Sequence, residues 1–130
     1  MILLDTHVVI WLMMDAEQLS VKVREAIVEA RIEGESLAYS PLSLYEIAYA
    51  AGRKRLRLNS GIPDFIAAIE ARLESLPLTT PIVICAAELP EPFHGDPIDR
   101  VIAATAIVHG CTLATHDLEI RRSGVCKTLW

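Results

Sequence analysis

The sequence is poor in aromatic side chains, in positive charge and in paired cysteines. Aromatic residues make up 5% of the 130 residues, and 12 basic against 17 acidic side chains give a net charge of −5. A protein that holds nucleic acid by charge alone is basic, and a reader that stacks bases needs aromatic rings. None of the three cysteines lies in a C-x-x-C pair, which predicts reduced thiols. The composition leaves room for an enzyme whose positive charge comes from a metal ion.

Two further absences exclude other classes of protein. No predicted strand is followed by a G-x-G-x-x-G or G-K-[ST] loop, so a nucleotide cofactor is not expected. No apolar run approaches the roughly 20 residues of a membrane span. Asp5 stands where a signal peptide would carry basic residues and then a longer apolar core. We therefore expect a cytoplasmic protein without a membrane segment.

The length is that of a single domain, which we assign to residues 1–130. Apolar segments too short for helices predict strands at 2–4, 37–39, 78–80, 112–114 and 126–129. Helical periodicity and end signals predict helices at 7–14, 21–33, 43–51, about 63–76, 81–89 and 96–109. This alternation indicates an α/β protein with a parallel sheet covered on both faces. Ligands bind such sheets beyond the carboxyl ends of the strands.

Acidic residues stand at the junctions where predicted strands end and helices begin. They are Asp5, Glu46, Asp96, Asp99 and Asp117. Because the carboxyl ends of parallel strands share one edge of the sheet, we expect these carboxylates to converge on one cleft. Carboxylates so close together repel one another unless a cation neutralises them. Oxygen ligands suit Mg²⁺ or Mn²⁺, and many nucleases use such clusters to activate water and stabilise charge on a phosphate.

Helix capping is the competing interpretation of each acid taken singly. Asp96 followed by Pro97 is a good helix start, with Asp99 favoured in the first turn. Ser43 and Glu46 match a capping box. The two remaining acids also stand where an N-cap would. Convergence of all five acids on one cleft is what distinguishes a functional site from separate caps.

Four motifs occur in order along the chain: Leu4-Asp5-Thr6-His7 with Trp11, Ser43-Leu44-x-Glu46, Asp96-Pro97-Ile98-Asp99-Arg100, and Thr115-His116-Asp117. As an ordered set over essentially the whole chain, they resemble PIN-domain proteins of the VapC type, the ribonuclease toxins of bacterial toxin–antitoxin pairs. The resemblance implies a three-layer α/β/α PIN-like fold with a short parallel sheet. It also implies an Mg²⁺- or Mn²⁺-dependent endoribonuclease that hydrolyses RNA with metal-activated water, a cognate antitoxin that blocks the cleft, and a homodimer.

The resemblance also suggests roles for the acids. By position, Asp5, Glu46, Asp99 and Asp117 match the acidic quartet of the family, and Asp96 matches an additional acid of the subgroup with a D-P-x-D-R motif. We expect Asp5 and Asp99 to bind the metal directly. Asp96 and Asp117 are expected to bind a second ion or to hold water on the metal. Glu46 is expected to ligate the metal or to act as a general base toward the attacking water.

Several neighbours of the acids have open roles. The hydroxyls of Thr6 and Thr115 could support the carboxylates or make ordinary turn hydrogen bonds. Gly95 and His116 stand where relatives often carry a basic residue, which leaves contacts with the substrate open.

Histidines and aromatic residues also occur in and near the motifs. His7 and His94 are expected to have structural or substrate-positioning roles. Trp11, Tyr45 and Tyr49 lie on apolar helix faces, so we expect them in the core or in a dimer contact rather than stacked on bases.

The strongest basic feature is the cluster Arg53, Lys54, Arg55 and Arg57. It follows a predicted helix end, where cations are favoured by the helix dipole. A solvated face and a surface toward RNA or an antitoxin are both compatible with it. Arg100, in the first turns of the predicted helix 96–109, could likewise contact phosphate or form a local ion pair.

Two alternative functions remain from the residues. A hydrolase that forms a covalent bond through an aspartate also places an acid after its first strand. Such enzymes usually carry a second acid two residues later, and that position is His7 here. The other alternative is a catalytically silent or partner-dependent PIN-fold module that binds RNA or protein. A purely structural role gives no reason to keep a cluster of mutually repelling acids, which favours the enzyme.

Overall fold

The protein is built on one five-stranded parallel sheet. The computed structural model describes residues 1–91, 93 and 95–130. The strands are β1 (Ile2–Leu4), β2 (Leu37–Tyr39), β3 (Glu74–Ser75), β4 (Thr112–Ala114) and β5 (Thr128–Leu129). Their order is β3-β2-β1-β4-β5, and each neighbouring pair is parallel. The chain moves outward from β1 to β3 and then returns to the other side of β1, so the topological switch lies between β1 and β4, where ligands bind such sheets.

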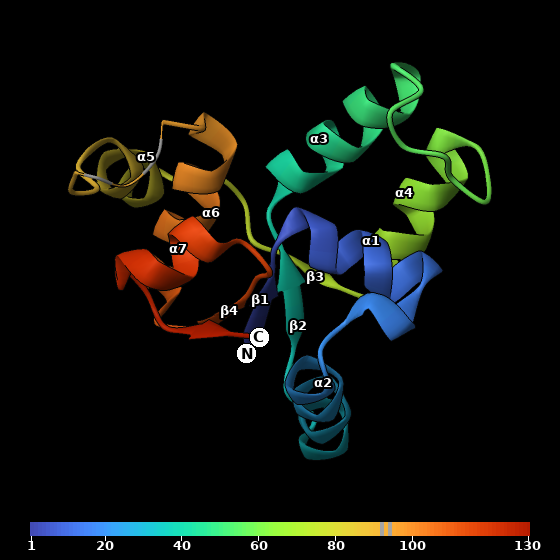
Figure 1. Ribbon diagram of the computed structural model, residues 1–130, viewed down its shortest axis with the longest axis horizontal. Coiled ribbons are helices and arrows are strands. Elements are labelled where there is room, and N and C mark those ends of the chain that lie inside the picture. Colours follow the sequence, from blue (N-terminus) through green and yellow to red (C-terminus); the bar gives the residue numbers. More distant parts are fainter. Residues whose placement is uncertain (92, 94) are drawn as a thin grey trace.

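Helices cover both faces of the sheet. They are α1 (Thr6–Met14), α2 (Val21–Glu33), α3 (Pro41–Gly52), α4 (Ile62–Glu70), α5 (Thr80–Ala87), α6 (Pro97–His109) and α7 (Leu118–Ser123), with a short 3-10 helix, η1 (Ala16–Gln18), after α1. In Figure 1, α5, α6 and α7 lie on one side of the sheet and α1 and α4 on the other. Of the helices in the described ranges, none is long and apolar enough to cross a membrane.

Successive side chains of β1 supply the two halves of the core. Leu4 packs in a cluster with residues of α1 to α4, including Val8 and Ile47. Leu3, on the opposite face, packs with Ile102 of α6 and Ile120 of α7. Because side chains alternate along a strand, a strand of three apolar residues is buried on both sides. The protein therefore has the predicted three-layer α/β/α architecture with a short parallel sheet.

Helix α6 is the central helix of its layer, as its apolar sequence predicts. Its alanines at 103, 104 and 106 are almost fully buried, and α5 packs on its outer side through Ile82 and Ala86. Arg100 joins the two helices. Its guanidinium donates hydrogen bonds to the carbonyl oxygens of Ala86 (3.1 Å), Leu89 (3.1 Å) and Phe93 (3.4 Å). Through these bonds Arg100 holds the end of α5 and the segment after it against α6, and its donors bind carbonyl oxygens rather than a phosphate.

We expect Arg100→Ala to lower the free energy of unfolding by about 2–3 kcal/mol, because several carbonyl oxygens lose a charged donor at once. Chemical denaturation with urea measures this change. Arg24→Ala, at an exposed position on α2, is the control and should change the free energy by less than about 0.5 kcal/mol. Equal effects of the two substitutions would contradict the anchoring role.

Local departures from the predicted elements have clear causes. The strand predicted at 78–80 is wrong: the pairing segment is β3, residues Glu74–Ser75. Leu73 and Leu76 are buried, so their spacing after Ile69 imitates the helical period although α4 already ends at Glu70. Helix α7 was not expected because six residues are too few for a periodic signal. The three cysteines are free thiols, as predicted.

Candidate active site

Two segments from the switch point hold the first carboxylate. Asp5 follows β1 directly, and its backbone N–H donates to the carbonyl oxygen of Ala114 at the end of β4 (3.0 Å). The side chain of Asp5 is only 5% exposed. Its Oδ1 accepts from the N–H of Thr6 (2.8 Å) and its Oδ2 from the hydroxyl of Thr115 (2.6 Å). The carboxylate of Asp5 is therefore fixed in position by both neighbouring strand ends.

Thr115 links Asp5 to Asp117. Its buried hydroxyl donates to Asp5 and accepts a hydrogen bond from the N–H of Asp117 (3.0 Å). Of the two roles considered for Thr115, support of a carboxylate and an ordinary turn hydrogen bond, its hydrogen bond to Asp5 fits the first. Thr6 behaves differently, because its hydroxyl donates to the hydroxyl of Ser43 (3.0 Å) and so joins α1 to α3.

Capping is real at three of the acids. Asp5 caps α1 through its bond from Thr6. Asp96 caps α6, accepting from the N–H groups of Ile98 (2.9 Å) and Asp99 (3.4 Å). Asp117 caps α7 through the N–H of Ile120 (3.0 Å). In each case the cap uses one carboxylate oxygen, Oδ1, so capping by itself does not occupy the other oxygen.

The capping box predicted for Ser43 and Glu46 is wrong. Helix α3 begins at Pro41, and its N-cap is Ser40, whose hydroxyl accepts from the N–H of Leu42 (3.3 Å). Ser40 followed by Pro41 is a stronger signal for the start of this helix than the apparent capping box of Ser43 and Glu46. Ser43 is fully buried against Thr6. Glu46 is therefore one turn inside the helix, and capping does not account for it.

The structure brings the five acids of the sequence hypothesis together. One cavity of about 440 Å³ is lined by Asp5, Glu46, Asp96, Asp99 and Asp117, together with three ring-bearing residues, His7, Trp11 and His116. The acids come from the ends of β1 and β4 and from the starts of α3 and α6. The fold therefore brings the five carboxylates together at the carboxyl edge of the sheet. The functional interpretation of the sequence depends on this convergence.

Burial and mutual repulsion together raise the pKa values of carboxyl groups in this cavity. Burial, and then the negative charges of Asp5, Asp96, Glu46 and Asp117, raise the pKa of Asp99 to about 8. Burial also raises the pKa of Asp5, although hydrogen bonds from Thr115 and Thr6 and the nearby His7 oppose this rise. A carboxyl group that four other acids push toward its neutral form lies in a strongly negative site.

The donor set of the cavity fits a hard divalent cation. Its acidic ligands are all carboxylate oxygens, the type that Mg²⁺ and Mn²⁺ prefer. Among the residues that the structure describes, no group of three or more His, Cys, Asp or Glu side chains forms a ready-made metal site. Mg²⁺ usually keeps several waters and binds through one or two carboxylates, so a rigid cage of three protein ligands is not required.

A cluster of rings borders the acids, and the sequence alone did not place it there. The ring of Trp11 lies 5.7 Å from His7, 5.6 Å from His116 and 5.7 Å from Trp130, measured between centroids. His116 and Trp130 are 4.9 Å apart and meet nearly edge to face. Trp130 lies far from Trp11 in sequence, so no local signal could connect them. His94 lies outside the described residues.

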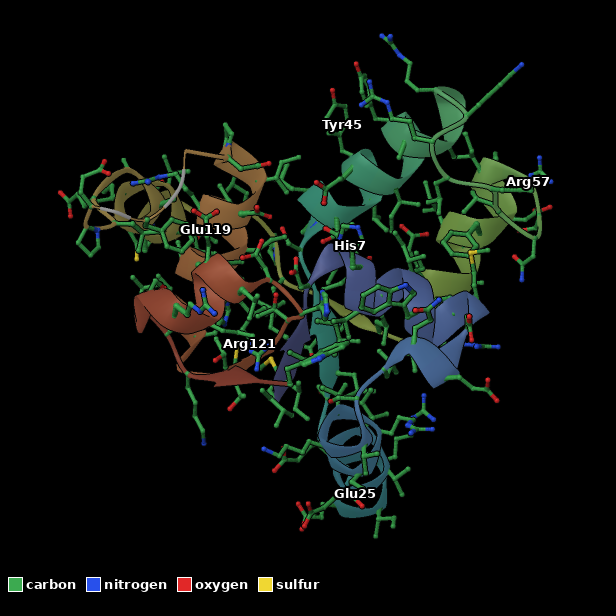
Figure 2. The ribbon with its side chains drawn as sticks, in the orientation of Figure 1. His7, Glu25, Tyr45, Arg57, Glu119 and Arg121 are labelled. Atoms are coloured by element: carbon green, nitrogen blue, oxygen red, sulfur yellow. The ribbon has the colours of Figure 1, made fainter. Side chains whose placement is uncertain are left out.

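A second groove continues from the acidic cavity. It has a volume of about 530 Å³ and shares His7, Trp11 and Glu46 with that cavity. His7, at the start of α1, and Tyr45, on α3, both line this groove and are labelled in Figure 2. Tyr45 is 60% exposed, so of the two roles expected for it the core role is wrong, and a dimer contact stays a prediction.

The structure divides the basic cluster. Arg55 lines the groove between α1 and α3. The guanidinium of Arg53 lies 4.8 Å from the ring of Tyr49, which is also substantially exposed. Arg57 lies toward α4, well away from His7 (Figure 2). Of these three arginines, Arg55 is the one that lines the groove joined to the acidic cavity.

Comparisons with known proteins agree with this fold and site. Residues 2–125 match the PIN domain family, and the chain belongs to that family. Over 120 residues it is 33% identical to Ribonuclease VapC22 of Mycobacterium tuberculosis, a match that covers 92% of this chain and 89% of that protein. This identity, over nearly the full length of both proteins, places the chain with the VapC-type members of the family.

Solved structures of similar fold have lower sequence identity. The crystal structure of VapBC2 from Rickettsia felis bound to a promoter DNA fragment gives a TM-score of 0.76 at 20% identity, covering 100% of this chain and 99% of that one. DNA-bound VapBC from Salmonella typhimurium gives 0.71 at 22% identity, covering 98% and 96%. These similarities support the three-layer fold.

Proposed function

We propose that this protein is an Mg²⁺- or Mn²⁺-dependent endoribonuclease and the toxin of a toxin–antitoxin pair. The observation that carries the proposal is the convergence of five carboxylates on one cavity, where burial and the charges of the other four raise the pKa of Asp99 to about 8. Membership of the PIN domain family and the identity with Ribonuclease VapC22 support RNA as the substrate.

The residues of the cavity would have different roles in binding the metal and activating water. A bound divalent ion supplies charge that neutralises a phosphate and lowers the pKa of water. Asp5 and Asp99 would hold the ion, with Asp5 kept in orientation by Thr115 and Thr6. Asp96 and Asp117 would bind a second ion or orient water. Glu46, in the second turn of α3, would complete the ligand set or accept the proton of the attacking water.

The proposed partners follow from the same assignment. The similar folds from Rickettsia felis and Salmonella typhimurium were solved as VapBC complexes, which supports a cognate antitoxin that blocks the cavity. A homodimer is part of the proposal, and residues 1–130 would act as a single domain. Helix α5 carries two apolar side chains, Val83 and Ile84, that are each about half exposed, and they would suit a contact between two copies.

The proposed function is tested by incubating purified protein with mixed cellular RNA and Mg²⁺ or Mn²⁺. Discrete fragments that disappear with EDTA and with Asp99→Asn would establish a selective metal-dependent nuclease, and mapping their ends would identify the target. Binding of metal without cleavage would instead favour a silent or partner-dependent module. The absence of metal binding would leave Asp5, Asp96 and Asp117 as helix caps alone and overturn the proposal.

Thr115 provides a further test of this arrangement. We expect Thr115→Val to lower the cleavage rate about 10- to 100-fold, because a group that orients a metal ligand is lost, while the backbone of the strand end is kept. The matched control is Thr105→Val, a buried threonine whose hydroxyl donates to the carbonyl oxygen of Val101 within α6 (2.7 Å). A cleavage rate for Thr115→Val equal to that of the control would contradict the positioning role of Thr115.

A further inference from the structure

One wall of the acidic cavity is made of rings rather than carboxylates. We call His7, Trp11 and His116 the aromatic wall; all three line the cavity that contains the five acids. The indole of Trp11 lies between the two imidazoles, at centroid distances of 5.7 and 5.6 Å. A group that contacts this wall is therefore next to whatever the acids hold.

The rings of the wall face the cavity and are not simply part of the core. His7 and His116 are exposed and Trp11 is only partly buried, whereas the neighbouring Val8 and Val9 of α1 are fully buried. Trp130 contacts Trp11 at 5.7 Å and His116 at 4.9 Å. These contacts limit the freedom of the rings, which are tilted to one another, so the wall is largely preformed. Preformed rings reduce the entropy lost when a ligand binds.

The charge of the cavity indicates what part of a substrate this surface would contact. Five carboxylates repel a phosphate chain, and the basic cluster places Arg55 in the adjoining groove rather than in this cavity. Any affinity near the scissile phosphate beyond what a bound divalent ion supplies then comes from contacts that do not depend on positive protein charge. Stacking of a base on an aromatic side chain meets this need, because every base has a π-face.

We propose that the aromatic wall binds a nucleobase of the RNA strand, in a nucleotide next to the phosphodiester held by the acids. The inference rests on the proposed nuclease function and adds the part of the substrate that is recognised. Trp11 also packs against the core, as expected from the sequence, and the inference concerns the part of its ring that lines the cavity. Trp11 contacts both histidine rings of the wall and lies nearly perpendicular to the ring of His116.

The experiment uses a short oligoribonucleotide that contains the mapped cleavage site, and a series of the same oligonucleotide with one base removed at each position in turn. KM and kcat are measured for the full-length wild-type protein, Trp11→Ala, Trp11→Phe and His116→Ala. The matched control is His109→Ala, an exposed histidine at the opposite end of α6 from Asp99. Asp99→Asn shows in parallel that cleavage depends on the acids.

We expect removal of one base next to the scissile phosphate to raise KM of the wild-type protein about 5- to 100-fold, the range typical of one stacked base, with kcat changed much less. Trp11→Ala should raise KM for intact RNA by a similar factor, and base removal should then have little further effect. Trp11→Phe should restore most of the affinity, His116→Ala should raise KM less, and His109→Ala should not change it.

Other outcomes would overturn the inference. If wild-type protein cleaves RNA with metal and Asp99 but no single base removal changes KM, the wall binds no base. The same conclusion follows if Trp11→Ala and base removal have independent, multiplying effects. If Trp11→Ala leaves KM for RNA unchanged but abolishes binding of the antitoxin, the wall binds a protein partner and not a base. No cleavage by wild-type protein with any divalent metal would overturn the proposed function and the inference together.

Discussion

Asp5→Asn and Asp99→Asn should each lower the rate of RNA cleavage at least about 100-fold while the protein remains folded. Removing a group that only orients a metal ligand typically costs 10- to 100-fold, so loss of a ligand itself should cost more. The amide keeps nearly the shape of the carboxyl group but removes the negative charge that would attract a cation. Initial rates on a defined RNA, with circular dichroism to confirm folding, measure the effect.

The control for this prediction is Asp15→Asn, an exposed aspartate after the far end of α1. It should leave the rate within about twofold of wild type, because it lies outside the acidic cavity. If Asp5→Asn and Asp99→Asn retained wild-type rates with Mg²⁺ present, the cavity would not be the site of cleavage.

The second large effect is on stability, and it has opposite signs with and without metal. In the metal-free protein the pKa of Asp99 is about 8, against 3.8 for an ordinary aspartate. Between about pH 4 and pH 8 the folded protein therefore holds a proton that the unfolded chain has lost, and the free energy of unfolding falls as the pH rises. Asp99→Asn removes the repelled charge and should stabilise the metal-free protein at pH 8.5.

The gain should be about 1–2 kcal/mol, since partial exposure of Asp99 screens part of the repulsion. It should shrink as the pH falls and nearly vanish at pH 4, where the carboxyl group is largely neutral in the unfolded chain as well as in the folded protein. Thermal unfolding in EDTA at the two pH values measures it. Addition of Mg²⁺ or Mn²⁺ at about 100 times its Kd should stabilise the wild-type protein by about 2.7 kcal/mol and the variant much less, which reverses their order. Equal stabilisation of both proteins by metal would contradict the site.

The sequence predicted the parts of this molecule that depend on local chemistry and on the geometry of parallel sheets. The apolar segments around Leu3 and Leu113 are too short for helices and buried on both faces, so they read as strands. The position of Asp5 and Asp117 after such strands was enough to predict that the two acids converge. Asp96 and its following proline marked the start of α6.

What the sequence could not predict depends on contacts between distant segments. The ring of Trp130 meets Trp11 and His116 only because β5 lies beside β4 in the sheet. Ser43 bonds to Thr6 from inside α3, which begins at Pro41 after the N-cap Ser40 rather than at the apparent capping box. β3 has only two residues, and two residues carry no alternation from which to predict a strand.

The central claim is that the five carboxylates form one divalent-cation site. It is tested most directly by anomalous X-ray diffraction from crystals of the protein grown with Mn²⁺. We predict a manganese peak inside the acidic cavity in coordinating contact with Asp5 and Asp99, and its loss in Asp99→Asn crystals. Crystals that contain Mn²⁺ at concentrations supporting RNA cleavage, yet show no peak in this cavity, would contradict the claim.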